Sequence, residues 1–156
     1  MHEQTKGRVL SRYVPLVVWL CVITYASSDG FSASNTSRII GPVVLWLFPN
    51  TSEETMTLIH LIVRKIAHFT EYGILGFLAV RAFRTSPGSY LSRHWFVISF
   101  LLVVVYALLD EYHQSFVPSR TSSIYDSFID MTGGLTVILL LRLWYRERQP
   151  SSISTI

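Results

Sequence analysis

Residues 94–114 read HWFVISFLLVVVYALLDEYHQ, an apolar run of helical length that ends in a group of polar side chains. A helix needs about 20 predominantly apolar residues to cross a bilayer. Half of the 156 residues are hydrophobic (50%) and only 15% are charged. We therefore expect an all-α integral membrane bundle, as a single domain covering 1–156. The four transmembrane helices are predicted at about 9–27, 66–83, 94–109 and 124–145.

The first predicted span has an alternative interpretation. Lys6, Arg8 and Arg12 precede its apolar run, as basic residues also precede the apolar region of a cleaved signal peptide. Because further apolar stretches follow along the chain, we favour a retained anchor over a cleaved leader.

An extra short helix is expected between the first two spans. Residues 38–48 are apolar, but they are too few to cross a bilayer and Gly41-Pro42 interrupts them. They are predicted to form an interfacial or re-entrant helix on the outer face. Thr51, with Glu54 three residues later, matches a capping box and predicts the start of the next helix. That helix is expected to continue without interruption to Phe83.

The basic residues predict the orientation, because cytoplasmic loops of membrane proteins carry an excess of Lys and Arg. A cytoplasmic N-terminus places nine basic residues inside and four outside. The inner nine are Lys6, Arg8, Arg12, Arg81, Arg84, Arg93, Arg142, Arg146 and Arg148, and the outer four are Arg38, Arg64, Lys65 and Arg120. We expect a multi-pass protein with both termini in the cytoplasm. The net charge of +3 reflects this bias, and no basic stripe interleaved with aromatics indicates a nucleic-acid partner.

Polar side chains gather near the predicted outer ends of three spans. A helix turns about 100° per residue, so sequence spacing gives the angular position of each side chain. Each span then presents one polar face, and these faces converge if the helices turn them toward one another. The faces consist of Arg64, Lys65, His68, Glu71 and Tyr72; of Tyr106, Asp110, His113 and Gln114; and of Asp126, Asp130 and Gly133. Glu111 points away from the second face, and Gly133-Gly134 predicts a close approach of the fourth helix to a neighbour.

Ionisable groups near hydrocarbon are costly and usually face a protein interior or a wet cavity. We therefore expect a polar site at this level of the bundle. The alternative is a purely structural role, in which Arg64, Lys65 and Arg120 pair with Glu71, Asp110 and Asp126 and fix the helices.

Two stretches resemble the signatures of the VanZ-like family of small bacterial membrane proteins. The first is residues 64–76, RKIAHFTEYGILG; the second is residues 110–120, DEYHQSFVPSR, followed by IYDSFID at 124–130 and by Gly133-Gly134. The resemblance covers about residues 13–142. Family motif positions fall here on Lys65, His68, Glu71, Tyr72, Asp110, Glu111, Gln114, Arg120, Asp126 and Gly133. The chain departs at Asp130, where the family usually has Asn, and at Val137, where a further Gly is common.

The resemblance implies a protein of the bacterial inner membrane and cell envelope, in a family named for a member linked to teicoplanin resistance. The expected partners are membrane lipids and a lipid-linked or phosphate- or carboxylate-bearing envelope molecule, or a glycopeptide. Candidate acid–base residues are His68, Glu71, Asp110 and Glu111. Candidate substrate-binding residues are Arg64, Lys65, Tyr72, Gln114, Arg120, Asp126 and Asp130.

Alternatives remain for what this site does. Carboxylates suit Mg²⁺ or Mn²⁺, so Asp110, Asp126 and Asp130, with His68, are conceivable ligands, but their spacing is not diagnostic and the sequence assigns no metal or cofactor. Whether the protein is an enzyme also stays open. The other hypotheses are a non-enzymatic membrane scaffold and a small transporter or proton relay.

Overall fold

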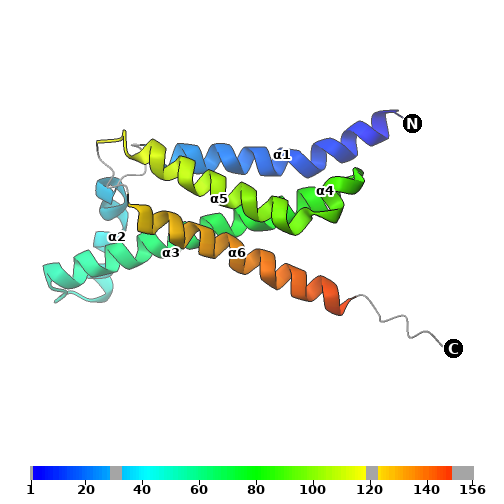
Figure 1. The fold of residues 1–156 in the computed structure, drawn as a ribbon. Coiled ribbons are helices and arrows are strands. Elements are labelled where there is room, and N and C mark those ends of the chain that lie inside the picture. Colours follow the sequence, from blue (N-terminus) through cyan, green and yellow to red (C-terminus); the bar gives the residue numbers. More distant parts are fainter. Residues whose placement is uncertain (1, 29–32, 119–122, 149–156) are drawn as a thin grey trace.

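The computed structural model describes residues 2–28, 33–118 and 123–148, and these ranges contain helices and no strands, as Figure 1 shows. This confirms the predicted all-α class. The helices of the described part are α1 (His2–Ala26), α2 (Ala33–Leu47), α3 (Glu53–Arg84), α4 (Ser89–Arg93), α5 (Trp95–Gln114) and α6 (Ile124–Glu147).

The four long helices lie alongside one another, and α3 contacts all of the others (Figure 1). The start of α1, the short helix α4 and the end of α6 lie at one end of the molecule, which we call the α4 end. The other end, called the α2 end, contains α2, the C-terminal ends of α1 and α5, and the start of α6. The first turns of α3 project beyond the other long helices there.

The start of α3 differs from the prediction by one residue. Ser52, and not Thr51, is the N-cap, because the Ser52 hydroxyl accepts a hydrogen bond from the Thr55 amide at 3.2 Å. The Thr51 hydroxyl instead donates to the Phe48 carbonyl oxygen at 2.7 Å, which closes the turn after α2. The expectation of one unbroken helix is confirmed, and it ends at Arg84.

The extra helix predicted at 38–48 is present as α2, but it begins five residues earlier, at Ala33. Its 15 residues correspond to roughly 22 Å of helix, which is shorter than a hydrocarbon core of about 30 Å. The five-residue helix α4 was not predicted from the sequence.

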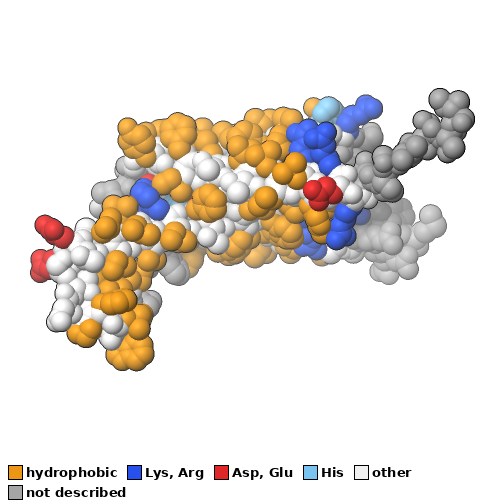
Figure 2. All heavy atoms as spheres, turned by 90° about the horizontal axis from the view of Figure 1, so that it is seen from below, with side chains coloured by type: hydrophobic (Ala, Val, Ile, Leu, Met, Phe, Trp, Pro, Cys, Tyr) orange, Lys and Arg blue, Asp and Glu red, His pale blue; other side chains and the backbone are white. Residues whose placement is uncertain are grey.

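Among the described residues, two helices, α5 and α6, are by length and composition apolar enough to cross a membrane, and Leu10–Ala26 forms a shorter apolar helix. Within their most apolar windows only 28% of α5 and 33% of α6 is buried inside the molecule, so most of this apolar surface faces outward. Figure 2 shows hydrophobic side chains along the length of the visible face, with Lys and Arg gathered at the α4 end. The core helix of a water-soluble protein would bury far more of its apolar surface.

The closest helix contact is between α3 and α6, and glycines form it. A Cβ atom added to Gly76 of α3 would lie 2.7 Å from the carbonyl oxygen of Gly134 on α6. The predicted close approach at Gly133-Gly134 is therefore confirmed. Val137, the departure from a small residue, packs against Gly73, with its Cγ2 atom 3.3 Å from the position of an added Cβ. This contact fixes the distance between the two helices that carry most of the polar side chains.

Candidate functional site

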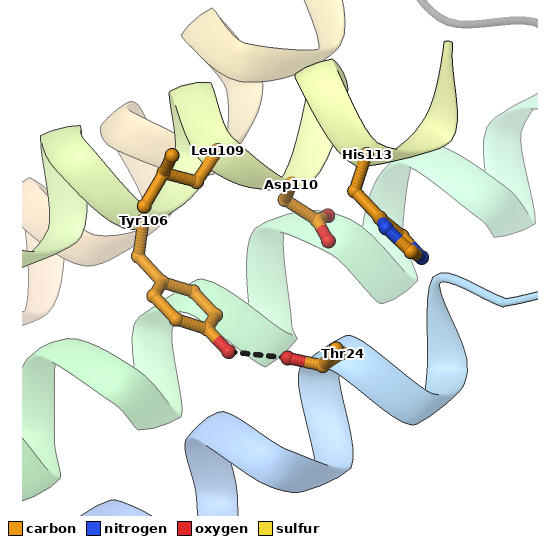
Figure 3. Close-up of a pocket in the computed structure, with 5 residues that line it drawn as sticks. All are labelled: Thr24, Tyr106, Leu109, Asp110 and His113. Carbon is orange, nitrogen blue, oxygen red and sulfur yellow. Dashed lines mark hydrogen bonds between the residues drawn. The ribbon is translucent and has the colours of Figure 1, made fainter. Parts of the chain in front are cut away.

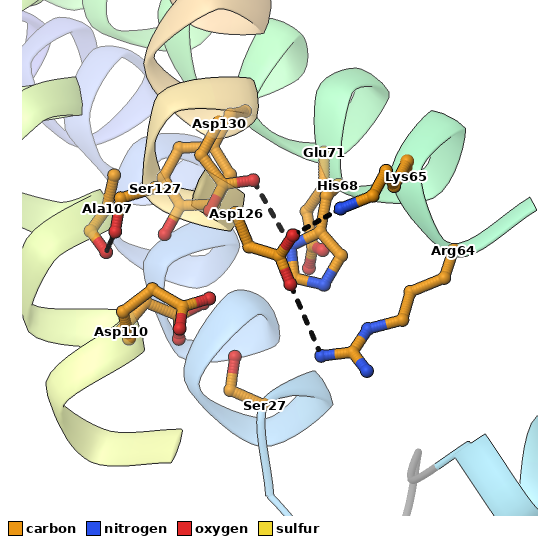
Figure 4. Close-up of polar contacts among 12 residues, drawn as sticks. Ser27, Arg64, Lys65, His68, Glu71, Ala107, Asp110, Asp126, Ser127 and Asp130 are labelled. Atoms are coloured by element: carbon orange, nitrogen blue, oxygen red, sulfur yellow. Dashed lines mark hydrogen bonds and ion pairs between the residues drawn. The ribbon is translucent and has the colours of Figure 1, made fainter. Parts of the chain in front are cut away.

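Buried polar side chains from three helices converge near the α2 end, as Figure 4 shows. His68 comes from α3, Asp110 from α5, and Asp126 and Asp130 from α6, and all four are buried. The helical spacing of the sequence places these residues on inward faces, as expected. We call this group, together with Gln114 of α5, the polar cluster.

At the edge of the polar cluster, Lys65 and Arg64 of α3 contact Asp126 of α6, and we call these contacts the rim pair. The Lys65 ammonium lies 2.5 Å from Asp126 Oδ1, and the Arg64 guanidinium lies 3.7 Å from Asp126 Oδ2. The Lys65 side chain is 40% exposed, whereas the Asp126 side chain is only 11% exposed. The two cations therefore neutralise Asp126 at the boundary between the bundle interior and its surroundings.

The interior of the polar cluster contains a histidine–carboxylate pair. His68 Nδ1 lies 3.1 Å from Asp130 Oδ1, and Asp130 is fully buried. The second carboxylate oxygen, Asp130 Oδ2, is buried and has no hydrogen-bond partner among the described residues. Most buried polar atoms do have a partner, so this oxygen requires an explanation.

The Asp110 carboxylate is hydrogen-bonded to a residue of its own helix, Gln114. The Gln114 side-chain amide donates to Asp110 Oδ2 at 3.0 Å, one turn along α5, and also to the hydroxyl of Ser27, directly after α1, at 3.4 Å. Gln114 is fully buried, and none of the residues that the structure describes forms a hydrogen bond with its Oε1 atom. The amide thus orients the Asp110 carboxylate and connects α1 to the polar cluster.

Glu111 has a different environment from Asp110. Its Oε2 atom accepts a hydrogen bond from the Ser123 amide at 2.7 Å, at the start of α6. Ser123 is also the N-cap of α6. Glu111 therefore secures the start of α6, consistent with its position off the shared polar face.

A pocket of about 170 Å³ opens beside Asp110, between α1 and α5 (Figure 3). Its lining residues are Thr24, Tyr106, Leu109, Asp110 and His113. Tyr106 Oη lies 2.5 Å from Thr24 Oγ1 and donates to the Leu20 carbonyl oxygen at 2.7 Å, which fixes one wall. Asp110 belongs to both the pocket and the polar cluster, so the pocket lies directly beside the cluster.

The remaining candidate residues have separate positions. Tyr72 is fully buried, and its hydroxyl donates to the Tyr106 carbonyl oxygen at 3.4 Å, so it packs α3 against α5. Glu71 is half-buried beside His68, and its carbonyl oxygen accepts the indole N–H of Trp19 at 3.0 Å. Arg120 lies outside the described residues.

Sequence reasoning missed the contribution of α1. Thr24 lines the pocket and Ser27 contacts Gln114, and both lie at the end of the span 9–27, which was predicted only as an anchor. Their spacing of three residues places them on one helix face, and this was the available signal.

The comparisons with known proteins agree with the sequence motifs. No curated protein and no solved structure matches the chain. A model of the VanZ/LLP1 family matches residues 13–145, a range that contains every residue of the polar cluster. The matched range is well over half of the chain, and the protein therefore belongs to the VanZ/LLP1 family.

Proposed function

We propose that the protein spans the bacterial inner membrane four times, with both termini in the cytoplasm. The antiparallel order of α1, α3, α5 and α6 supports this, since it brings the start of α1 and the end of α6 to the same end (Figure 1). Arginines at that end stack on aromatic rings, as is typical of a membrane–water interface. These pairs are Arg84 with Tyr145, Arg142 with Phe96 and Arg148 with Trp144, at 3.6, 4.5 and 4.1 Å from the ring centroids.

A reporter fused after Ile156 tests the orientation. Green fluorescent protein should fluoresce there, and alkaline phosphatase, which needs the periplasm, should be inactive. Active phosphatase at this position would reverse the proposed topology.

The depth of the polar cluster supports a site at the outer boundary of the membrane. Lys65 lies 19 residues before Arg84 on α3, which is roughly 29 Å at about 1.5 Å per residue. Asp126 likewise lies 19 residues before Tyr145 on α6. A hydrocarbon core is about 30 Å thick, so this spacing supports Lys65 and Asp126 near one boundary when the arginines lie at the other. Lipid headgroups and their phosphates occupy this level.

The function that this arrangement favours is binding of an anionic headgroup of a lipid-linked envelope molecule. The observation that carries the proposal is the rim pair, because Lys65 and Arg64 meet a single buried carboxylate, Asp126, at headgroup depth. A phosphate or carboxylate that approaches from the outer leaflet can take the place of Asp126 on one of these cations. Arg offers two parallel donors and Lys a compact charge, and both suit such anions.

Acid–base chemistry at the same site remains part of the proposal for His68, Glu71, Asp110 and Glu111. Among these, His68 has the arrangement that orients a general base, since its Nδ1 atom faces a carboxylate, Asp130. Glu111 is engaged by the Ser123 amide, which favours a positioning role for it. A scaffold or a proton relay would use the same residues without turnover.

Polyprenyl phosphate and the uncharged polyprenol form a matched pair of probes, because they share the lipid tail and differ in the phosphate. We expect only the phosphate to raise the melting temperature of the purified protein in detergent. At a concentration about 100 times Kd, one binding site adds roughly 2.7 kcal/mol to the free energy of unfolding. Lys65→Met should remove most of the shift. An equal shift with polyprenol would contradict headgroup recognition.

We also propose a link to glycopeptide resistance, which rests on the family resemblance. Expression of the wild-type chain in a susceptible host should raise the inhibitory concentration of teicoplanin. Asp110→Asn should abolish this effect while the protein stays in the membrane at wild-type abundance. Loss of the variant protein from the membrane would instead support the structural interpretation of the polar cluster.

A further inference from the structure

We infer that His68, Asp110 and Asp130 bind one divalent cation inside the bundle. The three side chains come from α3, α5 and α6, and all are buried. One possible ligand atom of each lies within 4.8 Å of the other two. This site lies beneath the rim pair and does not require that a headgroup binds there.

The charges around these residues favour a cation. In the described part of the chain, Lys65 and Arg64 form ion pairs with Asp126. Neither Asp110 nor Asp130 forms an ion pair with a lysine or an arginine there. Two carboxylates that face each other away from water repel strongly, because the surroundings screen charge poorly. A divalent cation between them neutralises both.

The unsatisfied oxygen of Asp130 is an independent sign of a ligand. Asp130 is fully buried and its Oδ1 atom contacts His68, whereas its Oδ2 atom has no hydrogen-bond partner within the described part of the chain. A metal ion accepts a lone pair from such an oxygen. Gln114 supplies the outer support that metal-binding carboxylates usually have, since its amide donates to Asp110 Oδ2.

The distances fit an ion after small side-chain movements. Metal–nitrogen and metal–oxygen bonds of Zn²⁺ are about 2.0–2.2 Å long, so two ligands of one ion lie roughly 3–4 Å apart. The three ligand atoms now lie within 4.8 Å of one another, so each side chain must move by less than about 1 Å to bind the ion. His68 and Asp130 would then exchange their mutual hydrogen bond for bonds to the ion.

The donor set indicates the class of ion. One imidazole nitrogen with two carboxylates suits Zn²⁺ or Mn²⁺, whereas Mg²⁺ and Ca²⁺ prefer oxygen ligands alone. The geometry also narrows the ligands that the sequence suggested. Asp126 already binds Lys65 and Arg64, so it belongs to the rim and not to the metal site.

The test uses the full-length protein in detergent, stripped with a chelator and titrated with Mn²⁺ and Zn²⁺. Calorimetry should show one ion per chain, with an increase in melting temperature. Asp130→Asn, which keeps the side-chain shape, should weaken the affinity at least about tenfold. Asp126→Asn is the matched control, one turn away on the same helix, and should keep wild-type affinity.

A spectroscopic readout covers the case in which Asp130→Asn fails to fold. Mn²⁺ bound to the wild-type protein should show magnetic coupling to a histidine nitrogen, and His68→Gln should remove it. Absence of stoichiometric binding, equal affinity in Asp130→Asn, or Mn²⁺ without nitrogen coupling would each overturn the inference.

The headgroup proposal is judged separately by the polyprenyl phosphate shift. Lys65→Met should remove most of that shift and leave Mn²⁺ binding intact. A lipid shift without metal binding rejects only the metal site, and metal binding without a lipid shift rejects only headgroup recognition.

Discussion

Replacing Gly133 with Ala should force α3 and α6 apart directly beside the polar cluster. The added Cβ atom would lie 2.9 Å from the carbonyl carbon of Phe69, and closer still to its carbonyl oxygen, whereas ordinary contacts begin at 3.4 Å. The obstructing atoms belong to a helix backbone, so they cannot rotate aside as the end of a side chain can. The two helices must therefore separate by at least about 0.5 Å at this level.

This separation has two consequences. Overpacking of this kind costs about 1–3 kcal/mol in the free energy of unfolding. It also reaches His68, the neighbour of Phe69, and Asp130, one turn before Gly133. Their hydrogen bond measures 3.1 Å, and a further ~0.5 Å takes it past the range of a useful N–H···O bond.

Thermal unfolding of the purified protein in detergent measures the first consequence. Gly7→Ala is the matched control, because it makes the same change inside a helix where no atom of the described residues lies within 4 Å of the added atom. The gain in helix propensity, up to about 1 kcal/mol, is common to both variants and cancels in the comparison. Gly133→Ala should melt several degrees below Gly7→Ala, at roughly 2–4 °C per kcal/mol. Equal melting temperatures would refute the close packing of α3 on α6.

Two further predictions concern contacts around the polar cluster. A double-mutant cycle of Lys65→Met and Asp126→Asn, read by thermal unfolding, should give a coupling below about 1 kcal/mol, because Lys65 is 40% exposed and solvent screens the pair; a coupling of several kcal/mol would show a rim sealed from solvent. Tyr106→Phe removes the hydroxyl that bonds Leu20 and contacts Thr24, so it should cost about 1 kcal/mol and speed amide hydrogen exchange in α1 but not in α6; unchanged exchange in α1 would contradict that role of Tyr106.

Helical periodicity made much of the polar cluster predictable. Lys65 and His68 are three residues apart and Asp126 and Asp130 are four apart, so each pair shares a face in any straight helix. Because ionisable side chains are costly next to hydrocarbon, these faces are expected to turn toward the interior of the bundle. The sequence could not predict which acid meets which base, because that depends on how far α3 is shifted along α6. The contact of Gly76 with Gly134 fixes this shift, and only the folded chain shows it.

Local signals were weaker where two residues compete for one role. Thr51 and Ser52 are both good N-caps, and the preceding turn decides between them, since Thr51 bonds Phe48. The role of α1 was also hidden. Small polar residues such as Thr24 and Ser27 at the end of an apolar run look like the approach to a loop until a partner such as Gln114 is placed beside them.

The glycine contacts between α3 and α6 bear on whether the polar cluster has only a structural role. Backbone contacts of Gly133 with Phe69 and of Gly134 with Gly76 already hold the two helices together. Polar pairs are therefore not needed to join them, and a buried charge pair often stabilises a fold less than apolar residues of the same size. If the polar cluster served only packing, leucines in its place would stabilise the fold more. The buried pair of His68 and Asp130, with one carboxylate oxygen unsatisfied, is a cost that the glycine contacts make unnecessary, which favours a ligand as the reason for it.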